Sequence, residues 1–169
     1  MSFPQQIPEI RPLFERSDYV DIKTVEGCTP LRRFIAAMLS HYPWWVVLLY
    51  RIRTVLVKIL GLVEHEAPEV LPNLQAEDVS FVAGDTVTFF TVRLANEDQY
   101  WVGETPEDKH LKAYFGVVVE PVADNRKRFH VITIVHYKHW TGPVYFNLIR
   151  PFHHLVVSRM VRAGVQAKK

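Results

Sequence analysis

Cysteine is almost absent from this chain, and the sequence also lacks a signal-peptide pattern and an extended basic region. The 169 residues include one cysteine, Cys28, so no disulfide can form within the chain. This fits a reducing compartment, and the N-terminus has no basic region followed by an apolar run. We therefore expect a cytoplasmic protein. The formal net charge is only +2, and Arg126–Arg128 is its one basic run, so we expect no nucleic-acid partner.

Glycine is scarce and scattered. The seven glycines form no Gly-x-Gly-x-x-Gly pattern, no phosphate-binding loop and no Gly-x-Ser-x-Gly nucleophile elbow. The sequence therefore points to no cofactor and to no serine nucleophile. Cys28 precedes a predicted helix, but a small half-buried residue is the ordinary role at such a junction.

One apolar run, Trp44–Val63, is long enough to span a bilayer, but it is interrupted by charge. Arg51, Arg53 and Lys58 fall within it. Each charge near the centre of a span costs about 2.5–3.5 kcal/mol on insertion scales. We expect no transmembrane segment, and a peripheral membrane role for Trp44–Lys58 is a minor alternative.

Hydrophobic periodicity divides the rest of the chain into strands followed by a long helix. Thr29 and Pro30 are a favourable helix start, and Pro143 suits the first turn of the last helix. Pro151 should kink that helix or split it in two. The predicted strands are 18–26, 79–83, 86–94, 99–104, 109–122 and 128–139, and the predicted helices are 31–42, 44–60 and 144–163.

Short turns between successive strands predict one curved antiparallel sheet. With two helices after the first strand and a long amphipathic C-terminal helix, the order predicts an α+β, helix-grip fold. We expect an extended lead-in over 1–17, a single domain over 18–164 and a frayed tail over 165–169.

The stretch Phe129–His154 holds five of the eight histidines, yet their spacing does not suit a metal site. His136 shares a strand face with Ile132 and Ile134, and His153 lies on the apolar side of the last helix, whereas His154 should face water. If the His136 face looks toward that helix, His136 and His153 border one cavity.

Further polar groups join this predicted pocket. Arg53 borders the apolar side of its helix, His110 follows the turn after Glu104, and Glu104 and Asp108 are the candidate acid partners. Apolar walls with a few polar groups are typical of small-molecule sites. The alternative is that both histidines are hydrogen-bonded core residues and that Arg53 makes a structural ion pair.

Several of these residues also resemble a known family pattern. The chain contains Glu104, Asp108–Leu111, Thr133–Tyr137, Trp140–Gly142, Tyr145–Phe146 and Pro151–His153, with Arg53 and Leu60–Leu62 earlier. This string is similar to that of domain-of-unknown-function family 2867, a mainly bacterial family of the START-like superfamily. The resemblance implies the helix-grip fold and adds Trp140 and Tyr145 to the predicted ligand pocket. Lys138 and Thr141 depart from the family pattern.

Three hypotheses follow. The first is a binding protein for a small apolar or amphipathic ligand held between sheet and helix. The second is an enzyme that uses His136 as acid or base in that cavity, with Arg53 holding an anionic group. The third is an interaction module for a separate short-chain-dehydrogenase-like reductase, because the resemblance includes relatives fused to such a domain. The sequence leaves open which of these holds, whether any reaction occurs, and the oligomeric state.

Overall fold

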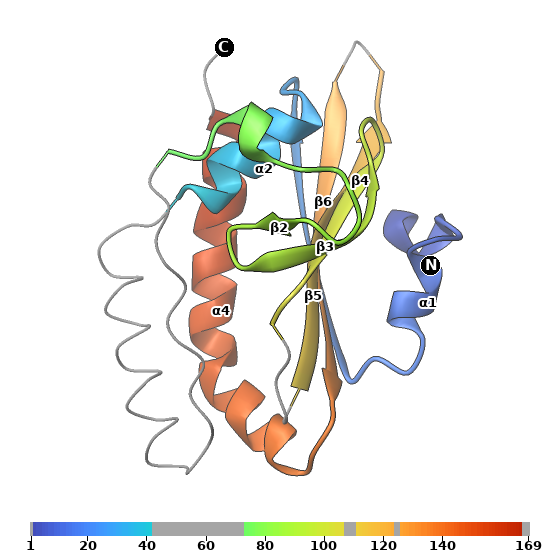
Figure 1. Ribbon diagram of the computed structural model, residues 1–169, viewed down its shortest axis with the longest axis vertical. Coiled ribbons are helices and arrows are strands. Elements are labelled where there is room, and N and C mark those ends of the chain that lie inside the picture. The colour runs from blue at the N-terminus through green and yellow to red at the C-terminus, as the bar shows by residue number, and fades with distance from the viewer. Residues whose placement is uncertain (1, 42–72, 107–110, 124–125, 167–169) are drawn as a thin grey trace.

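A computed structural model describes residues 2–41, 73–106, 111–123 and 126–166. Within them a six-stranded antiparallel sheet has the order β1-β6-β5-β4-β3-β2. Two helices lie against one side of this sheet, and the N-terminal segment lies against the other (Figure 1). The strands are β1 (Tyr19–Gly27), β2 (Thr86–Val87), β3 (Phe90–Asn96), β4 (Tyr100–Glu104), β5 (Leu111–Pro121) and β6 (Lys127–Tyr137). The helices are η1 (Phe3–Gln6), α1 (Arg11–Phe14), α2 (Leu31–Leu39), η2 (Ala76–Asp78) and α4 (Thr141–Gln166).

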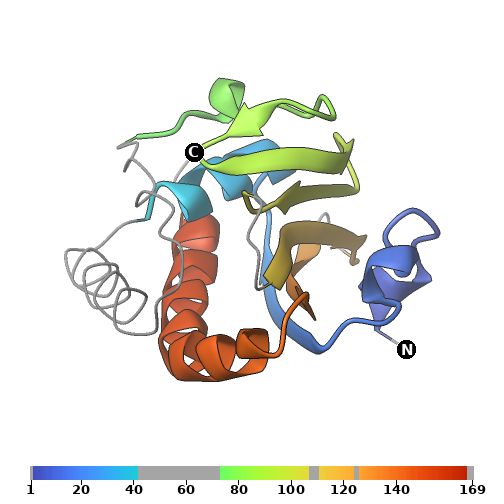
Figure 2. The same ribbon diagram turned by 60° about the horizontal axis from the view of Figure 1, so that its bottom comes forward.

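This arrangement confirms the predicted α+β, helix-grip fold. Strands β3 to β6 follow one another as antiparallel neighbours, and β1 closes the far edge beside β6. Helix α4 then runs along the sheet, as two views of the molecule show (Figures 1 and 2). Among the described residues, no helix is long and apolar enough to cross a membrane. The predicted helix over 44–60 lies outside them.

The strand count agrees with the sequence, but two strands differ from the predicted ones. Residues 79–83 form no strand, and the carbonyl oxygen of Ser80 accepts a hydrogen bond from the indole Nε1 of Trp101 at 3.0 Å. The predicted strand over 86–94 is divided into β2 and β3 by a turn in which Thr88 has a φ of 57°. A left-handed residue interrupts an extended run, so one predicted strand becomes a short hairpin.

Helix α4 is longer than predicted and is not split. It begins at Thr141 and ends at Gln166, with Pro151 inside it. Proline removes one backbone donor but does not end this helix, since contacts with the sheet and with α2 hold it on both sides of that residue.

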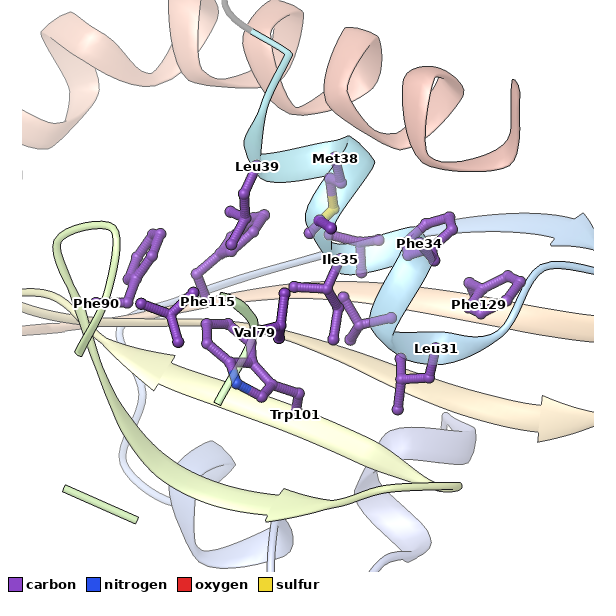
Figure 3. Close-up of a cluster of buried hydrophobic side chains, with 14 of the residues drawn as sticks. Leu31, Phe34, Ile35, Met38, Leu39, Val79, Phe90, Trp101, Phe115 and Phe129 are labelled. Carbon is purple, nitrogen blue, oxygen red and sulfur yellow. The ribbon is translucent and has the colours of Figure 1, made fainter. Parts of the chain in front are cut away.

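The inner face of the sheet, defined as the face covered by α2 and α4, carries the larger core. Phe34 of α2 stacks on Phe129 of β6 with ring centroids 4.2 Å apart. Side chains of α2 meet those of the sheet, including Trp101, which is fully buried (Figure 3). Gly164 of α4 allows the close approach of α2, because an added Cβ would lie 2.8 Å from the Phe34 ring.

The outer face of the sheet is also apolar, and the N-terminal segment covers it. Ile10 is completely buried against Ile132, Ile134 and neighbouring residues of the outer face. The predicted extended lead-in is therefore wrong in its conformation, because residues 3–6 and 11–14 form short helices that pack on the sheet (Figure 1). The central strands are consequently buried on both faces.

Gly116 of β5 lies directly against the backbone of β4. A Cβ at this position would lie 2.7 Å from the carbonyl oxygen of Trp101, which is backbone and cannot rotate away. We expect Gly116→Ala to lower the free energy of unfolding by about 1–3 kcal/mol through overpacking. Urea unfolding followed by circular dichroism measures this.

Gly27 provides the matched control, because it also lies in a strand. A Cβ there would come no closer than 3.4 Å to another side chain, the nearest atom being Val165 Cγ1. Gly27→Ala should cost less than about 1 kcal/mol. Equal losses in the two variants would contradict the steric explanation.

Candidate functional site

A layer of polar side chains crosses the interior between the sheet and α4. Along β6, Val131 belongs to one apolar cluster and Val135 to another, and Thr133 lies between them. The same change occurs along α4, where His153 and His154 separate Val157 from Ile149. We call the set Asp21, Lys23, Thr133, His153 and His154 the polar layer.

Strand pairing explains why β1 contributes to this layer. Tyr19, Asp21, Lys23 and Val25 alternate along the strand and therefore share one face. Asp21 is the register partner of Thr133, so both point to the inner face. Val20 and Ile22 take the opposite face, which the N-terminal segment covers.

His154 connects α4 to β1. Its Nε2 lies 2.9 Å from the Tyr19 hydroxyl, and its Nδ1 lies 3.2 Å from Lys23 Nζ. Asp21 Oδ2 lies 3.5 Å from the same Nδ1 and 3.2 Å from Lys23 Nζ. The contacts of Asp21 with Lys23 and His154 are within ion-pair distance but lack hydrogen-bond geometry. Buried Asp21 Oδ2 therefore receives no hydrogen bond from any described residue. The His154 side chain is 38% exposed and its ring also contacts the inward polar face of β1, so the prediction that His154 faces water is correct only in part.

His153 differs from His154 in that one of its ring nitrogens is buried without a hydrogen-bond partner. Its Nδ1 is fully enclosed and has no hydrogen-bond partner within the part of the chain that the structure describes. Its ring lies 6.4 Å from that of Phe146 between centroids. Burial lowers the pKa of His153 to about 4, and Asp21 partly opposes this shift while His154 and Lys23 add to it. His153 is therefore a neutral imidazole at pH 7.

Tyr19 and Arg150 lie at the rim of the polar layer. The guanidinium carbon of Arg150 lies 5.7 Å from the centroid of the Tyr19 ring. The pKa of Tyr19 is raised, mainly by burial and then by Asp21, while Arg150 opposes the rise. The phenol therefore stays protonated at pH 7 and keeps a proton that it can donate.

His136 does not face this layer. Its Nε2 donates to the backbone oxygen of Leu13 at 3.0 Å, and its ring meets that of Tyr114 edge-on. It shares a face with Ile132 and Ile134 as predicted, but that face packs against the N-terminal segment. The prediction that His136 and His153 border one cavity is therefore wrong. His136 is a hydrogen-bonded residue of the outer face, which removes the basis for it as an acid or base between sheet and helix.

The other predicted site residues divide three ways. Tyr145 lies in the apolar cluster at the start of α4, on the inner side as predicted. Trp140 is 75% exposed at the turn before α4, so it does not line the interior. Glu104 pairs with Arg93 at 3.0 Å and with Lys112 at 2.9 Å, away from either interior histidine. Arg53, Asp108 and His110 lie outside the described residues.

Sequence reasoning missed most of the polar layer. The alternation of Tyr19, Asp21 and Lys23 was a visible signal, and it predicted the strand but not its orientation. A polar strand face is usually the solvent face, and here it is the inner one. Across the described ranges, no group of three or more metal-ligating side chains has metal-binding geometry.

The layer can hold a polar group of a ligand inside an apolar frame. His153 offers one ring nitrogen as acceptor or donor, depending on its tautomer, and Tyr19 offers a hydroxyl. Apolar side chains flank both sides of the layer. Such a combination suits an amphipathic small molecule better than a strongly charged one.

Comparison with known proteins supports the resemblance inferred from the motifs. A family model described as "Protein of unknown function (DUF2867)" matches residues 13–160. No curated protein matches the chain in sequence.

Solved structures with a similar arrangement include three proteins of low sequence identity. Norcoclaurine synthase from Thalictrum flavum, in complex with dopamine and hydroxybenzaldehyde, is 14% identical over 89% of this chain and 88% of its own, with a TM-score of 0.42. A START superfamily protein from Mycobacterium smegmatis is 12% identical over 87% and 97%, with a TM-score of 0.42. Ara h 8.0201 is 9% identical over 86% and 97%, with a TM-score of 0.40.

Proposed function

This chain belongs to the DUF2867 family of proteins of unknown function, and we propose that it binds a small apolar or amphipathic molecule between its sheet and helix α4. The observation that supports this most is the pair of buried atoms His153 Nδ1 and Asp21 Oδ2, which lack hydrogen bonds among the described residues. Native proteins pair nearly all buried polar atoms, and each one left without a partner costs about 1–3 kcal/mol. A ligand that supplies the missing partners offsets this cost.

The surroundings of these atoms define the kind of molecule. The clusters on either side contain mainly aliphatic and aromatic side chains, such as Val157 on one side and Phe146 on the other. A ligand there gains most of its binding free energy from apolar burial. The polar layer then fixes its position by one or two hydrogen bonds.

Native mass spectrometry of the purified full-length chain, followed by organic extraction, tests the proposal. We expect a reproducible mass above that of the polypeptide and an extractable small molecule. Thr133→Leu, which places a larger apolar side chain in the polar layer, should reduce the bound fraction at least about fivefold. A chain with the polypeptide mass alone, in repeated preparations, would count against the proposal.

Thr91→Leu is the matched control. Thr91 is an exposed strand residue of β3, away from the polar layer. This variant should retain the extractable molecule. Equal loss in both variants would show that the effect of Thr133→Leu is not local.

The hypothesis of a reductase-like partner stays a prediction, because it depends on a second protein. Pull-down from the native host remains its test. Recovery of no such partner would speak against it.

A further inference from the structure

The rim between β1 and α4 has a defined direction of hydrogen bonding. We call Tyr19, Lys23, Arg150 and His154 the β1–α4 seam. Because β1 is an edge strand of the sheet, the seam lies at that edge, where His154 of α4 contacts β1. Arg150 is exposed, and the other three side chains are partly buried.

Lys23 determines which atom donates in each hydrogen bond of the seam. The Lys23 ammonium can only donate, so at 3.2 Å the Nδ1 of a neutral His154 accepts from it. The proton of that imidazole is then on Nε2, which donates to the Tyr19 oxygen at 2.9 Å. The Tyr19 hydroxyl proton is therefore not used within the seam.

Among the described residues, Asp21 is the carboxylate that lies within ion-pair distance of Lys23 and His154. It lies 3.5 Å from His154 Nδ1 but closer to Lys23 Nζ, at 3.2 Å. Its charge is thus balanced mainly by the lysine. With both ring nitrogens of His154 protonated, Nδ1 no longer accepts from Lys23, but Nε2 still donates to Tyr19, whose oxygen still accepts.

Arg150 provides a positive charge that the described part of the chain does not balance. Its guanidinium lies against the Tyr19 ring, and none of the described carboxylates forms an ion pair with it. Asp18, near the start of β1, instead accepts a hydrogen bond from the backbone N–H of Tyr137 at 2.6 Å. One contact, that of Arg150 with the Tyr19 ring, therefore joins a phenol whose proton is not used in the seam to a guanidinium without a carboxylate partner among the described residues.

We propose that the β1–α4 seam binds the carboxylate of an amphipathic ligand, with the Tyr19 hydroxyl donating to it and Arg150 balancing its charge. The inference rests on the proposed function and specifies the ligand class. The apolar part lies inward from Tyr19, whose ring contacts Phe146 at 4.7 Å between centroids, in the cluster that also contains Ile149 and Val135. A carboxylate accepts both contacts and carries the negative charge that Arg150 balances, whereas an alcohol is neutral and an alkyl amine is cationic at neutral pH.

Dodecanoate and 1-dodecanol are suitable probes, since they share a chain and differ in the head group. Binding is measured by isothermal titration calorimetry with the full-length protein after organic extraction and refolding checks. We expect dodecanoate to bind at least about tenfold more tightly than dodecanol, the difference expected of a hydrogen bond to a charged group. Tyr19→Phe and Arg150→Gln should each weaken dodecanoate about tenfold and leave dodecanol within about twofold.

Two matched controls separate the seam from general effects. Tyr100→Phe removes a hydroxyl from the outer face, and Arg159→Gln removes an exposed arginine from the same helix. Both should bind dodecanoate as the parent does. Equal affinity for the two probes, or dodecanoate binding unaffected by both seam variants, would overturn the carboxylate assignment and leave the proposed function standing. Binding of neither probe also overturns the assignment, and the extraction experiment above then decides the proposed function separately.

Discussion

A chain that lacks residues 2–17 is expected to lose its stable fold and to aggregate. These residues cover the outer face of the sheet, which is formed by large apolar side chains. These are Tyr100, Val102, Tyr114, Val118, Ile132 and Ile134. Without the cover, that face becomes an exposed apolar patch of the kind that promotes aggregation. Size-exclusion chromatography and thermal unfolding should show aggregates or a broad transition in place of a cooperative one.

Point variants keep this prediction testable if the truncated chain cannot be purified. Ile10 is completely buried on the outer face, so Ile10→Ala should lower the free energy of unfolding by about 2–5 kcal/mol. Gln6→Ala changes an exposed residue of the same segment and should be within about 0.5 kcal/mol of the parent. A stable, monomeric truncated chain would show that the segment is dispensable.

The double-sided burial of the sheet explains what the sequence could predict and what it could not. The period of two gave the strands, their antiparallel order and the long final helix, since these depend on local patterns. It could not orient β6, because Val131 and Val135 on one face are as apolar as Ile132 and Ile134 on the other. With both faces apolar, alternation contains no information about which one meets α4.

The similar apolarity of the two β6 faces explains why the prediction for His136 fails, and the inward polar face of β1 explains why the contacts of His154 were not predicted. The N-terminal segment contains prolines and has no hydrophobic periodicity, so its sequence does not indicate that it covers a sheet face. Without that information, the His136 face is a candidate for the side that meets α4. His154 was assigned to water because its helical neighbours are polar. Its partners, Tyr19 and Lys23, are distant in sequence and meet it only through the pairing of β1 with β6.

His153 is the predicted site residue whose inward position the structure supports, and its enclosure has a consequence for stability. The lowered pKa means that the folded protein binds a proton at this residue less readily than the unfolded chain does. Below the unfolded pKa, the unfolded chain holds more protons and is favoured. The stabilisation from a neutral His153 is thus fully present above about pH 6.5 and is lost as the pH falls toward 4.

We expect the wild-type protein to lose roughly 3 kcal/mol of its free energy of unfolding between pH 7 and pH 4 through this histidine alone, since each pKa unit corresponds to about 1.4 kcal/mol. Denaturant unfolding across that range measures the loss, and His153→Gln should show a pH dependence that is weaker by this amount. The groups that act on His153 are Asp21, Lys23 and His154, and all remain in the variant, so the difference between the two curves isolates one ring.

His139→Gln provides the control, because His139 is an exposed histidine at the end of β6 and its substitution should leave the pH dependence unchanged. Parallel curves for wild type and His153→Gln would mean that the ring is solvated in the folded state. The enclosed Nδ1 atom would then no longer support a ligand in the polar layer. A bound molecule that is hydrogen-bonded to the neutral ring of His153 should make the free energy of unfolding fall more steeply as the pH is lowered. Protonation of His153 then removes a ligand contact in addition to burying a charge.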